Sequence, residues 1–309
     1  MRIAVTGATG FIGNYLVKAL TEKGHDLRLL HREGRESALP QTTGGSVELH
    51  AGDLTKPETI EGFLENQERL IHLAAAHDHV EDELMRSITV GGTEALLADA
   101  TRFGHNKDEA FEIWIVSSAV IGAPVYSYYR DTKRIQEKLI RGSGINWTSF
   151  RPTLVYGVND MRHTAPLLRK CAGQSGKFVI PHDGKSRISP VHVDDVVEAI
   201  MLYFDYEIGI DCCYELAGPQ GMSYNQFVDD TIAAAGGTLT RKNVSKKWAD
   251  RAIFLKGLFT DTTADRRASA YFTLDHEHDI TNAVDELGWS PRPYAEGIKQ
   301  VAQGDWWKE

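Results

Sequence analysis

A tyrosine and a lysine four residues apart, Tyr129 and Lys133, are the strongest candidates for catalysis in this sequence. Of the 11 tyrosines, only Tyr129 has a lysine at this spacing, which on a helix places both side chains on one face. A phenol can exchange a proton with a carbinol or carbonyl when its phenolate is stabilised, and a nearby ammonium stabilises it. An isolated pair of this kind is more often an ordinary surface pair, so the neighbouring elements decide its meaning.

Two serines, Ser117 and Ser118, give the pair that context. They end an apolar run at Ile113–Val116, which is a predicted strand. In a parallel sheet, the carboxyl ends of the strands are where a substrate binds. A hydroxyl at this edge can hold a substrate oxygen, so the serines and the Tyr–Lys pair together predict acid–base chemistry at an alcohol or ketone.

Three glycines near the N-terminus, Gly7, Gly10 and Gly13, follow an apolar segment at Arg2–Thr6 and precede a helical pattern. Gly7 permits a tight turn, Gly10 lets the backbone approach a ligand, and Gly13 lets the helix pack against the strand. The free N–H groups and the positive end of the helix favour an anion. A strand, a glycine-rich turn and a helix in this order predict a pyrophosphate site that binds a dinucleotide.

The end of the next apolar segment indicates which dinucleotide binds. An NAD enzyme usually has an acid there for the ribose hydroxyls, but His31 stands at this position and Arg32 follows it. A guanidinium suits a 2′-phosphate through its fork of donors and its fixed charge, and Arg35 is close by. We therefore predict NADP(H) as cofactor, with NAD as the alternative, although a solvated loop would also explain these residues.

Apolar runs and helical patterns alternate along the first half of the chain. Strands are predicted at Leu27–Leu30, Val47–Leu49, Leu70–Leu73, Ile113–Val116, Trp147–Phe150 and Val191–Val193. Helices are predicted at about Thr59–Glu65, Glu83–Phe103, Arg130–Arg141 and Asp194–Phe204. This order predicts an α/β fold, a Rossmann-type doubly wound parallel sheet.

From about Val158, the alternation of strand and helix patterns becomes less regular. The region from Gly209 onward is predicted to be rich in helices, with several breaks at Gly and Pro. We expect an NAD(P)-binding domain in residues 1–157 and about 191–208. A smaller α+β C-terminal substrate lobe is expected in about 158–190 and 209–309, with a strand at Cys212–Ala217. At 309 residues, the chain is long enough for both.

Composition predicts a cytoplasmic enzyme. The formal charge of −9 argues against nucleic-acid binding, because no basic stripe would neutralise phosphates. No apolar run reaches the ~20 residues that a membrane span needs, and no signal peptide precedes the first strand. The three cysteines, Cys171, Cys212 and Cys213, have no framework spacing and are expected to be reduced thiols.

Six short motifs occur in order along almost the whole chain: Thr6–Gly13, Gly52–Leu54, Ile71–Ala75, Arg151–Gly157, Val191–Val196, and Glu286–Trp289 with Pro291. In this order they resemble the extended short-chain dehydrogenase/reductase family. That family includes nucleotide-sugar epimerases and dehydratases, dihydroflavonol reductases and 3β-hydroxysteroid dehydrogenases. The pattern of the C-terminal part, with Arg266-Arg267 and then Tyr271–Asp279, is more similar to the flavonol and sterol branch.

The resemblance implies a catalytic set of Ser118, Tyr129 and Lys133. Tyr129 would be the acid–base group, and Lys133 would lower its pKa and hold the nicotinamide ribose. Ser118 is favoured as the second serine of the pair, whereas counting backward from Gly122 favours Ser117. With Tyr129 and Lys133, the implied cofactor-binding residues are Gly7, Thr9, Gly10, Phe11, Ile12, Gly13, Arg32, Asp53, Leu54, Leu73, Ala74, Ala75, Pro152 and Val155.

The sequence departs from the family pattern at three places. Only ten residues separate Ser118 from Tyr129, where extended members usually have a longer insertion that contacts substrate. Thr89 stands where the family often has an asparagine. Ile188 stands where sugar-nucleotide members place a phosphate-binding arginine, with Arg187 one step earlier. Because a one-residue shift turns a strand side chain to the other face, a nucleotide diphosphate substrate is disfavoured.

The sequence therefore predicts an NADP(H)-dependent oxidoreductase that interconverts a secondary alcohol and a ketone or aldehyde, with Tyr129 transferring the proton. A nucleotide-sugar epimerase or dehydratase that recycles its cofactor is the alternative within the enzyme class. A dinucleotide-sensing or assembly protein without turnover is the alternative outside it. The substrate is expected to be an apolar small molecule, and the family resemblance implies a homodimer.

Other residues have simpler interpretations. His72 and His192 fall in predicted strands and are expected to be core or supporting residues. The run His276–Asp279 fits no compact metal spacing, so we expect no metal. The stretch from Lys246 is expected to be a lobe helix rather than an interfacial one, with Phe254, Leu258 and Phe259 lining an apolar pocket.

Overall fold

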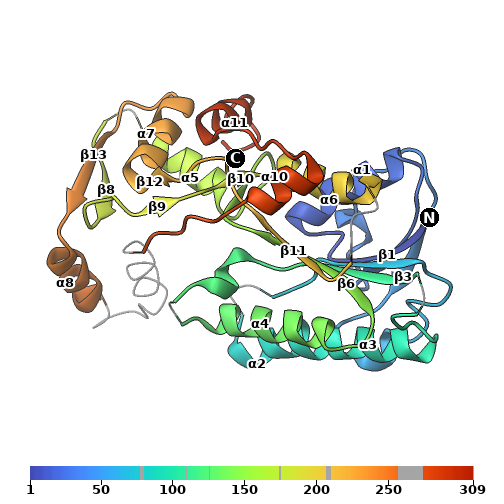
Figure 1. The fold of residues 1–309 in the computed structure, drawn as a ribbon. Coiled ribbons are helices and arrows are strands. Elements are labelled where there is room, and N and C mark those ends of the chain that lie inside the picture. The colour runs from blue at the N-terminus through green and yellow to red at the C-terminus, as the bar shows by residue number, and fades with distance from the viewer. Residues whose placement is uncertain are drawn as a thin grey trace. The chain divides into compact units, whose positions relative to one another are not determined.

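The computed structural model confirms an α/β fold built on a doubly wound parallel sheet (Figure 1). It describes residues 1–76, 80–108, 110–124, 126–173, 175–206, 210–256 and 274–308. The chain divides into two compact units. The first unit contains residues 1–152, 196–216 and 281–289, and the second contains residues 153–195, 217–280 and 290–309.

The first unit contains a seven-stranded parallel sheet in the order β11-β6-β5-β4-β1-β2-β3. Its strands are β1 (Arg2–Thr6), β2 (Asp26–His31), β3 (Val47–Ala51), β4 (Arg69–His72), β5 (Glu112–Val116), β6 (Asn146–Pro152) and β11 (Cys212–Leu216). The central strands are apolar and buried, as expected for a sheet covered on both faces. The strand order reverses between β1 and β4, which is where doubly wound sheets bind ligands.

Helices cover both faces of this sheet (Figure 1). Those of the first unit are α1 (Phe11–Glu22), α2 (Asp82–Arg86), α3 (Gly92–Arg102), α4 (Tyr128–Arg141), the part of α6 (Val193–Tyr206) from Val196 onward, and α10 (Thr281–Leu287). In Figure 1, α3 and α4 lie side by side on one face, and α1 lies on the other. A buried apolar cluster packs α3 and α4 against the strands, with Leu96, Ile113, Ile115 and Ile140 among its members.

The predicted helix at Thr59–Glu65 is wrong. The segment forms only a short 3₁₀ turn at Pro57–Thr59. The Asp99 carboxylate accepts the backbone N–H groups of Gly62 and Leu64, each at 2.8 Å, so these donors are not available for a continuing helix. Gly62 also adopts a positive φ of 81°, which ends helical geometry.

The long helix predicted at Glu83–Phe103 is interrupted. Between α2 and α3, Ser87–Gly91 forms a π-helical turn. There the Thr89 hydroxyl oxygen accepts the backbone N–H of Ala76 at 3.1 Å. Widened turns of this kind often occur at functional sites, and this one lies where the family pattern often has asparagine.

The strand predicted at Cys212–Ala217 forms as β11, but it lies in the first unit rather than in the C-terminal lobe. It pairs in parallel with β6, with Cys212 opposite Thr148 and Leu216 opposite Pro152. Its side chains are half-buried to buried, because it is an edge strand with a helix against one face. Segment Thr281–Trp289 also joins this unit.

The second unit has small sheets and helices around its own core. Its elements are β7 (Val155–Tyr156), α5 (Thr164–Cys171), β8 (Lys177–Pro181), β9 (Arg187–Ile188), β10 (Val191–His192), β12 (Met222–Ser223), α7 (Tyr224–Ala234), β13 (Thr240–Val244), α8 (Lys246–Lys256) and α11 (Tyr294–Val301). Three two-stranded sheets pair β10 with β7, β12 with β9, and β13 with β8. Aromatic rings at Tyr156, Phe227 and Tyr294 pack together in the core.

The three cysteines form no disulfide. Among the described residues, no helix has both the length and the apolar character needed to cross a membrane.

Candidate functional site

The glycine-rich turn between β1 and α1 packs closely against neighbouring backbone. Gly7 has a φ of 77°, and a Cβ there would lie 2.8 Å from the backbone nitrogen of Ala74. A Cβ on Gly13 would lie only 2.1 Å from the Gly7 carbonyl oxygen. Both positions therefore require glycine.

The N-terminus of α1 leaves its backbone donors open. Gly10 precedes the helix without a side-chain cap, and the first turn has no acidic residue. Thr9 and Gly10 are exposed, and Phe11 and Ile12 are half-buried. An uncapped helix end without negative charge attracts an anion. The turn thus fits the pyrophosphate of a dinucleotide.

The segment after β4 lies directly beside this turn. Leu73, Ala74 and Ala75 are half-buried, and the Ala74 backbone N–H donates to the Thr6 hydroxyl at 3.3 Å. These residues follow β4, the strand that pairs with β1, and lie beside the glycine turn.

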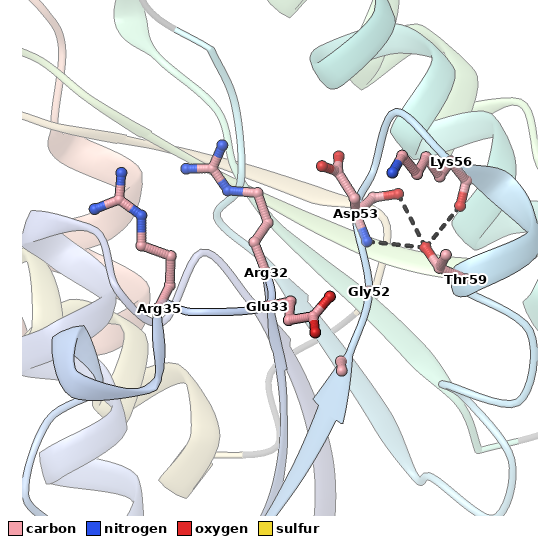
Figure 2. A pocket seen from close by; sticks show the side chains of 8 residues that line it. Arg32, Glu33, Arg35, Gly52, Asp53, Lys56 and Thr59 are labelled. Atoms are coloured by element: carbon pink, nitrogen blue, oxygen red, sulfur yellow. Dashed lines mark hydrogen bonds between the residues drawn. The ribbon is translucent and has the colours of Figure 1, made fainter.

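A pocket of about 320 Å³ opens beyond the ends of β2 and β3 (Figure 2). It is lined by Arg32, Glu33, Arg35, Ala51, Gly52, Asp53, Lys56 and Thr59. In Figure 2, the guanidinium groups of Arg32 and Arg35 point the same way from one loop, and Asp53 projects from the segment opposite. The pocket offers three cations and two carboxylates to a ligand.

Asp53 is held in its ionised form. Its Oδ1 accepts the backbone N–H and the hydroxyl of Thr55 at 2.9 and 2.8 Å. Burial raises the pKa of Asp53, but these bonds and the nearby Arg32 outweigh it, so the pKa lies below its usual value. The neighbouring Leu54 is buried and packs in the core cluster, so its side chain supports the loop.

The sequence assigned no role to two residues near this pocket, His31 and Glu33. His31 is 7% exposed, and its Nδ1 lies 3.2 Å from the Arg32 carbonyl oxygen and 3.4 Å from a Glu36 carboxylate oxygen. It therefore supports the loop. Glu33, which the sequence pattern did not single out, lines the pocket together with Lys56. No local sequence motif distinguishes Glu33 and Lys56 from other charged loop residues.

Lys133 is buried at the carboxyl edge of the sheet. Helix α4 begins after Ser127, whose hydroxyl oxygen accepts the Arg130 backbone N–H, and the helix places Lys133 one turn beyond the half-buried Tyr129. The Lys133 Nζ donates to the Val116 carbonyl oxygen at 3.0 Å and to the Gln136 side-chain oxygen at 2.7 Å. Burial lowers the pKa of Lys133 to about 7, although nearby Glu137 raises it.

The two serines at the end of β5 have different surroundings. Ser117 is 4% exposed, and its backbone N–H donates to the Phe150 carbonyl oxygen at 2.7 Å. Ser118 is half-buried and caps the short turn Ala119–Gly122, its hydroxyl oxygen accepting the Val120 N–H at 3.3 Å. Ser118 is therefore the more accessible hydroxyl at this edge.

Gln136 connects Lys133 to the strands, a role that the sequence pattern did not indicate. It is fully buried, and its side-chain nitrogen lies 2.9 Å from the His72 Nε2. His72 is 1% exposed, in agreement with the core role expected for it. Nothing in a single sequence links positions 72 and 136, which become neighbours only through strand pairing and helix packing.

Glu137 joins α4 to β6. It accepts the Ser149 hydroxyl at 2.9 Å and is paired with Arg151, whose Nε lies 3.1 Å away. Burial raises the pKa of Glu137, but the hydrogen bonds from Arg151, Ser117 and Ser149 and the charge of Arg151 lower it by more. The pKa of Glu137 therefore lies below its usual value. Pro152, which ends β6, is buried in the first unit, and the half-buried Val155 begins β7 in the second.

In the second unit, Arg187 is engaged by protein groups. Its guanidinium pairs with Glu277 and donates to the Gly221 carbonyl oxygen. The neighbouring Ile188 is half-buried in β9. His192 is 4% exposed, and burial lowers its pKa to about 4. Neither Arg187 nor His192 presents an uncommitted charge.

Leu258 and Phe259 lie outside the described residues, as do Arg266, Arg267 and the first part of Tyr271–Asp279. The side chain of Phe254 is likewise not described. Among the described residues, no three His, Cys, Asp or Glu side chains gather in a group that could hold a metal ion.

Known proteins with similar sequences include two reductases. The chain is 29% identical over 203 residues to a ceramide reductase of Caulobacter vibrioides. The aligned region covers 65% of this chain and 60% of that protein. It is 24% identical over 272 residues to a 2-alkyl-3-oxoalkanoate reductase of Stenotrophomonas maltophilia, covering 81% of each.

The fold is shared with solved structures. A UDP-glucose 4-epimerase of Thermotoga maritima, solved with UDP-glucose, superimposes with a TM-score of 0.72 at 21% identity and covers 98% of both chains. The model of the NAD dependent epimerase/dehydratase family matches residues 3–209, well over half of the chain. The protein therefore belongs to the NAD dependent epimerase/dehydratase family and is an NAD(P)-dependent enzyme.

Proposed function

We propose that this protein is an NADP(H)-dependent oxidoreductase that interconverts a secondary alcohol and a ketone or aldehyde. The main observation that supports this proposal is the buried amine of Lys133. It lies one helical turn beyond Tyr129 and donates to the carbonyl oxygen of Val116, the last residue of β5. Burying a charged amine costs free energy, and an ionisable group buried in this way is a candidate for a functional site. Its place beside a tyrosine at the ligand edge of the sheet supports acid–base catalysis.

The proposed roles follow from the chemistry of each group. The bound nicotinamide supplies or accepts the hydride. Tyr129 gives its phenolic proton to the substrate oxygen in reduction and takes it back in oxidation. Lys133 stabilises the phenolate by its charge. Ser118 donates a hydrogen bond to the same substrate oxygen, which holds the reacting carbon in place.

The preference for NADP(H) rests on the pocket at the ends of β2 and β3. Arg32, Arg35 and Lys56 place three cations around it, and a 2′-phosphate would neutralise part of that charge. Glu33 acts in the opposite direction, since a carboxylate repels phosphate and could accept ribose hydroxyls. The excess of cations favours the phosphate.

A reductase of apolar ketones is favoured over a nucleotide-sugar epimerase. The arginine nearest the position that would meet a nucleotide phosphate, Arg187, is already paired with Glu277. Two of the relatives similar to this chain carry the names ceramide reductase and 2-alkyl-3-oxoalkanoate reductase. We extend this substrate class to the present protein.

The test combines turnover with ligand binding. Purified protein is incubated with NADPH and a panel of long-chain and alicyclic ketones, and NADPH consumption is followed by absorbance. Melting temperatures are measured in parallel with the same ketones and with UDP- and dTDP-sugars, because ligands that bind the native state raise stability. Ketone-dependent oxidation of NADPH supports the proposal.

Two outcomes would oppose it. Stabilisation by a nucleotide sugar without a response to ketones would indicate an epimerase or dehydratase. Tight dinucleotide binding without turnover of any substrate would indicate a sensing or assembly role. We also propose a cytoplasmic homodimer by family resemblance, for which light scattering of the purified protein and fractionation of cells are the tests.

A further inference from the structure

A series of buried polar side chains connects Lys133 to Gln136, His72 and Thr6 through hydrogen bonds. Gln136 is 0% exposed and lies on α4, three residues after Lys133. Its Oε1 accepts Lys133 Nζ at 2.7 Å, and its Nε2 lies 2.9 Å from His72 Nε2 and 3.1 Å from Thr93 Oγ1. One amide thus joins a helix lysine to a strand histidine.

The direction of each hydrogen bond follows from Lys133. Below its pKa of about 7, Lys133 is an ammonium that only donates, so the amide oxygen of Gln136 must face it and the NH₂ group must face His72. His72 Nε2 therefore accepts, which places the imidazole proton on Nδ1. That proton is donated to Thr6 Oγ1 at 2.6 Å. Thr93 donates to the Thr89 carbonyl at 2.7 Å and so can accept from Gln136.

His72 is suited to this role because it is neutral. Burial, with the charge of Lys133, lowers its pKa to about 3. A neutral imidazole has one donor and one acceptor nitrogen, and each has a partner of the right kind here. A charged His72 would present two donors and could not accept from Gln136.

The other charged groups near Lys133 are turned elsewhere. On α4, Glu137 is bonded to Ser149 and Arg151. From β4 comes the neutral His72, and β5 contributes the Val116 carbonyl. The turn before α3 contributes the Thr89 carbonyl and α3 the Thr93 hydroxyl, both of which lie against Gln136. The Lys133 amine therefore donates to two uncharged oxygens, those of Val116 and Gln136.

We propose that Gln136 is the positioning residue of this site: its amide, oriented by the Nδ1–H form of His72, holds the Lys133 amine in one place. The inference rests on the proposed function only in the expectation that displacing the amine slows turnover. The bonding pattern itself can be tested on the protein without substrate.

The first measurement is the imidazole ¹⁵N spectrum of the protein without cofactor, with His72 assigned by substitution. The wild-type protein should show His72 neutral with its proton on Nδ1. In Gln136→Glu, the carboxylate accepts from both sides, so the His72 proton should move to Nε2 and Thr6 should donate to Nδ1. A wild-type His72 that is charged, or protonated on Nε2, would overturn the inference.

The second measurement is the titration of the Lys133 amine by ¹⁵Nζ NMR. Gln136→Glu adds a carboxylate and should raise the titration point by about one pH unit or more. Gln136→Leu removes an acceptor and should lower it. Gln67→Leu, a change of a buried glutamine elsewhere in the same unit, should leave both the lysine titration and the His72 tautomer as in the wild type.

Turnover provides a separate readout. With a ketone that the wild type reduces, Gln136→Leu should lower kcat about 10- to 100-fold with KM for the ketone nearly unchanged. Unchanged kcat and an unchanged lysine titration would overturn the inference and leave the proposed function intact. If Gln136→Leu does not fold, the wild-type tautomer and Gln136→Glu still decide the question. The predicted tautomers without any ketone reduction would support the inference and count against the function.

Discussion

The Nζ of Lys133 lies 3.0 Å from the carbonyl oxygen of Val116, the last residue of β5. This bond ties the helix that carries Tyr129 to the strand that directly precedes the two serines. Because the donor is buried and the acceptor belongs to a central strand, their separation is set by the core rather than by a loop. The candidate catalytic groups therefore share one rigid support.

Replacing Tyr129 by Phe should lower turnover by about 10²- to 10⁴-fold, because the proton donor is lost while the ring remains. Steady-state kinetics with the wild-type substrate and fluorescence titration with NADPH would measure both effects. Cofactor affinity should stay within about twofold of the wild-type value. The matched control is Tyr128→Phe, one residue earlier on α4. Equal turnover in Tyr129→Phe and wild type would remove Tyr129 from the mechanism.

Replacing Lys133 by Met should change how stability depends on pH. Burial lowers the folded-state pKa of Lys133 from 10.5 to about 7. Between these values the unfolded chain holds a proton that the folded chain has released, so this group makes folding more favourable as pH rises. Below pH 7, both states are charged and the full burial penalty applies.

Lys133→Met removes the cost of burying a charged amine, so it should stabilise the protein relative to wild type at pH 7. This difference in the free energy of unfolding should shrink by about 3 kcal/mol between pH 7 and pH 10. Urea unfolding at several pH values measures it, and pH-independent packing effects cancel in the comparison. Lys138→Met, at an exposed lysine on the same helix, should show no such trend. Parallel pH curves for wild type and Lys133→Met would show that Lys133 stays protonated when folded.

Replacing Arg32 by Ala should weaken NADP(H) binding by about 1.5–3 kcal/mol, the range for hydrogen bonds to charged groups. NAD(H) affinity should change little, since NAD lacks the 2′-phosphate. Glu33→Gln should act in the opposite direction, because it removes a carboxylate from the same pocket. Calorimetric titration with both dinucleotides is the measurement, and Arg134→Ala on α4 is the control. Equal losses of affinity for NADP(H) and NAD(H) would show that Arg32 does not bind the 2′-phosphate.

Replacing Gly13 by Ala should destabilise the protein by about 1–3 kcal/mol and weaken dinucleotide binding, because the new Cβ would lie 2.1 Å from a backbone oxygen. Gly91→Ala is a suitable control, since a Cβ there meets nothing within 4 Å and no positive φ is involved. Its stability should stay within about 1 kcal/mol of wild type. A Gly13→Ala protein with normal melting temperature and NADPH affinity would contradict the tight turn.

The cofactor turn and the Tyr129 helix could be predicted because their signals are local. Gly7, Gly10 and Gly13 follow a strand within seven residues, and Lys133 is one helical turn from Tyr129. The errors arose where distant residues decide local structure. Asp99 takes the backbone donors of the predicted helix at Thr59–Glu65, and no pattern within that segment contains this information.

The supporting residues could not be predicted for the same reason. Gln136 and Glu137 are adjacent on α4, yet one contacts His72 and the other Ser149 and Arg151. Their roles depend on strand order, which a helical pattern does not encode. The place of β11 has a similar cause. A five-residue strand fits either unit by its sequence, and only pairing with β6 assigns it.

The late position of β11 in the chain has a consequence for synthesis on the ribosome. Until Cys212–Leu216 has emerged, β6 is an uncovered edge with Trp147 and Phe150 among its side chains. Such an edge invites pairing with other nascent chains. Truncated products that stop between residues 152 and 211 should therefore aggregate or depend on chaperones, because they lack the strand that covers this edge.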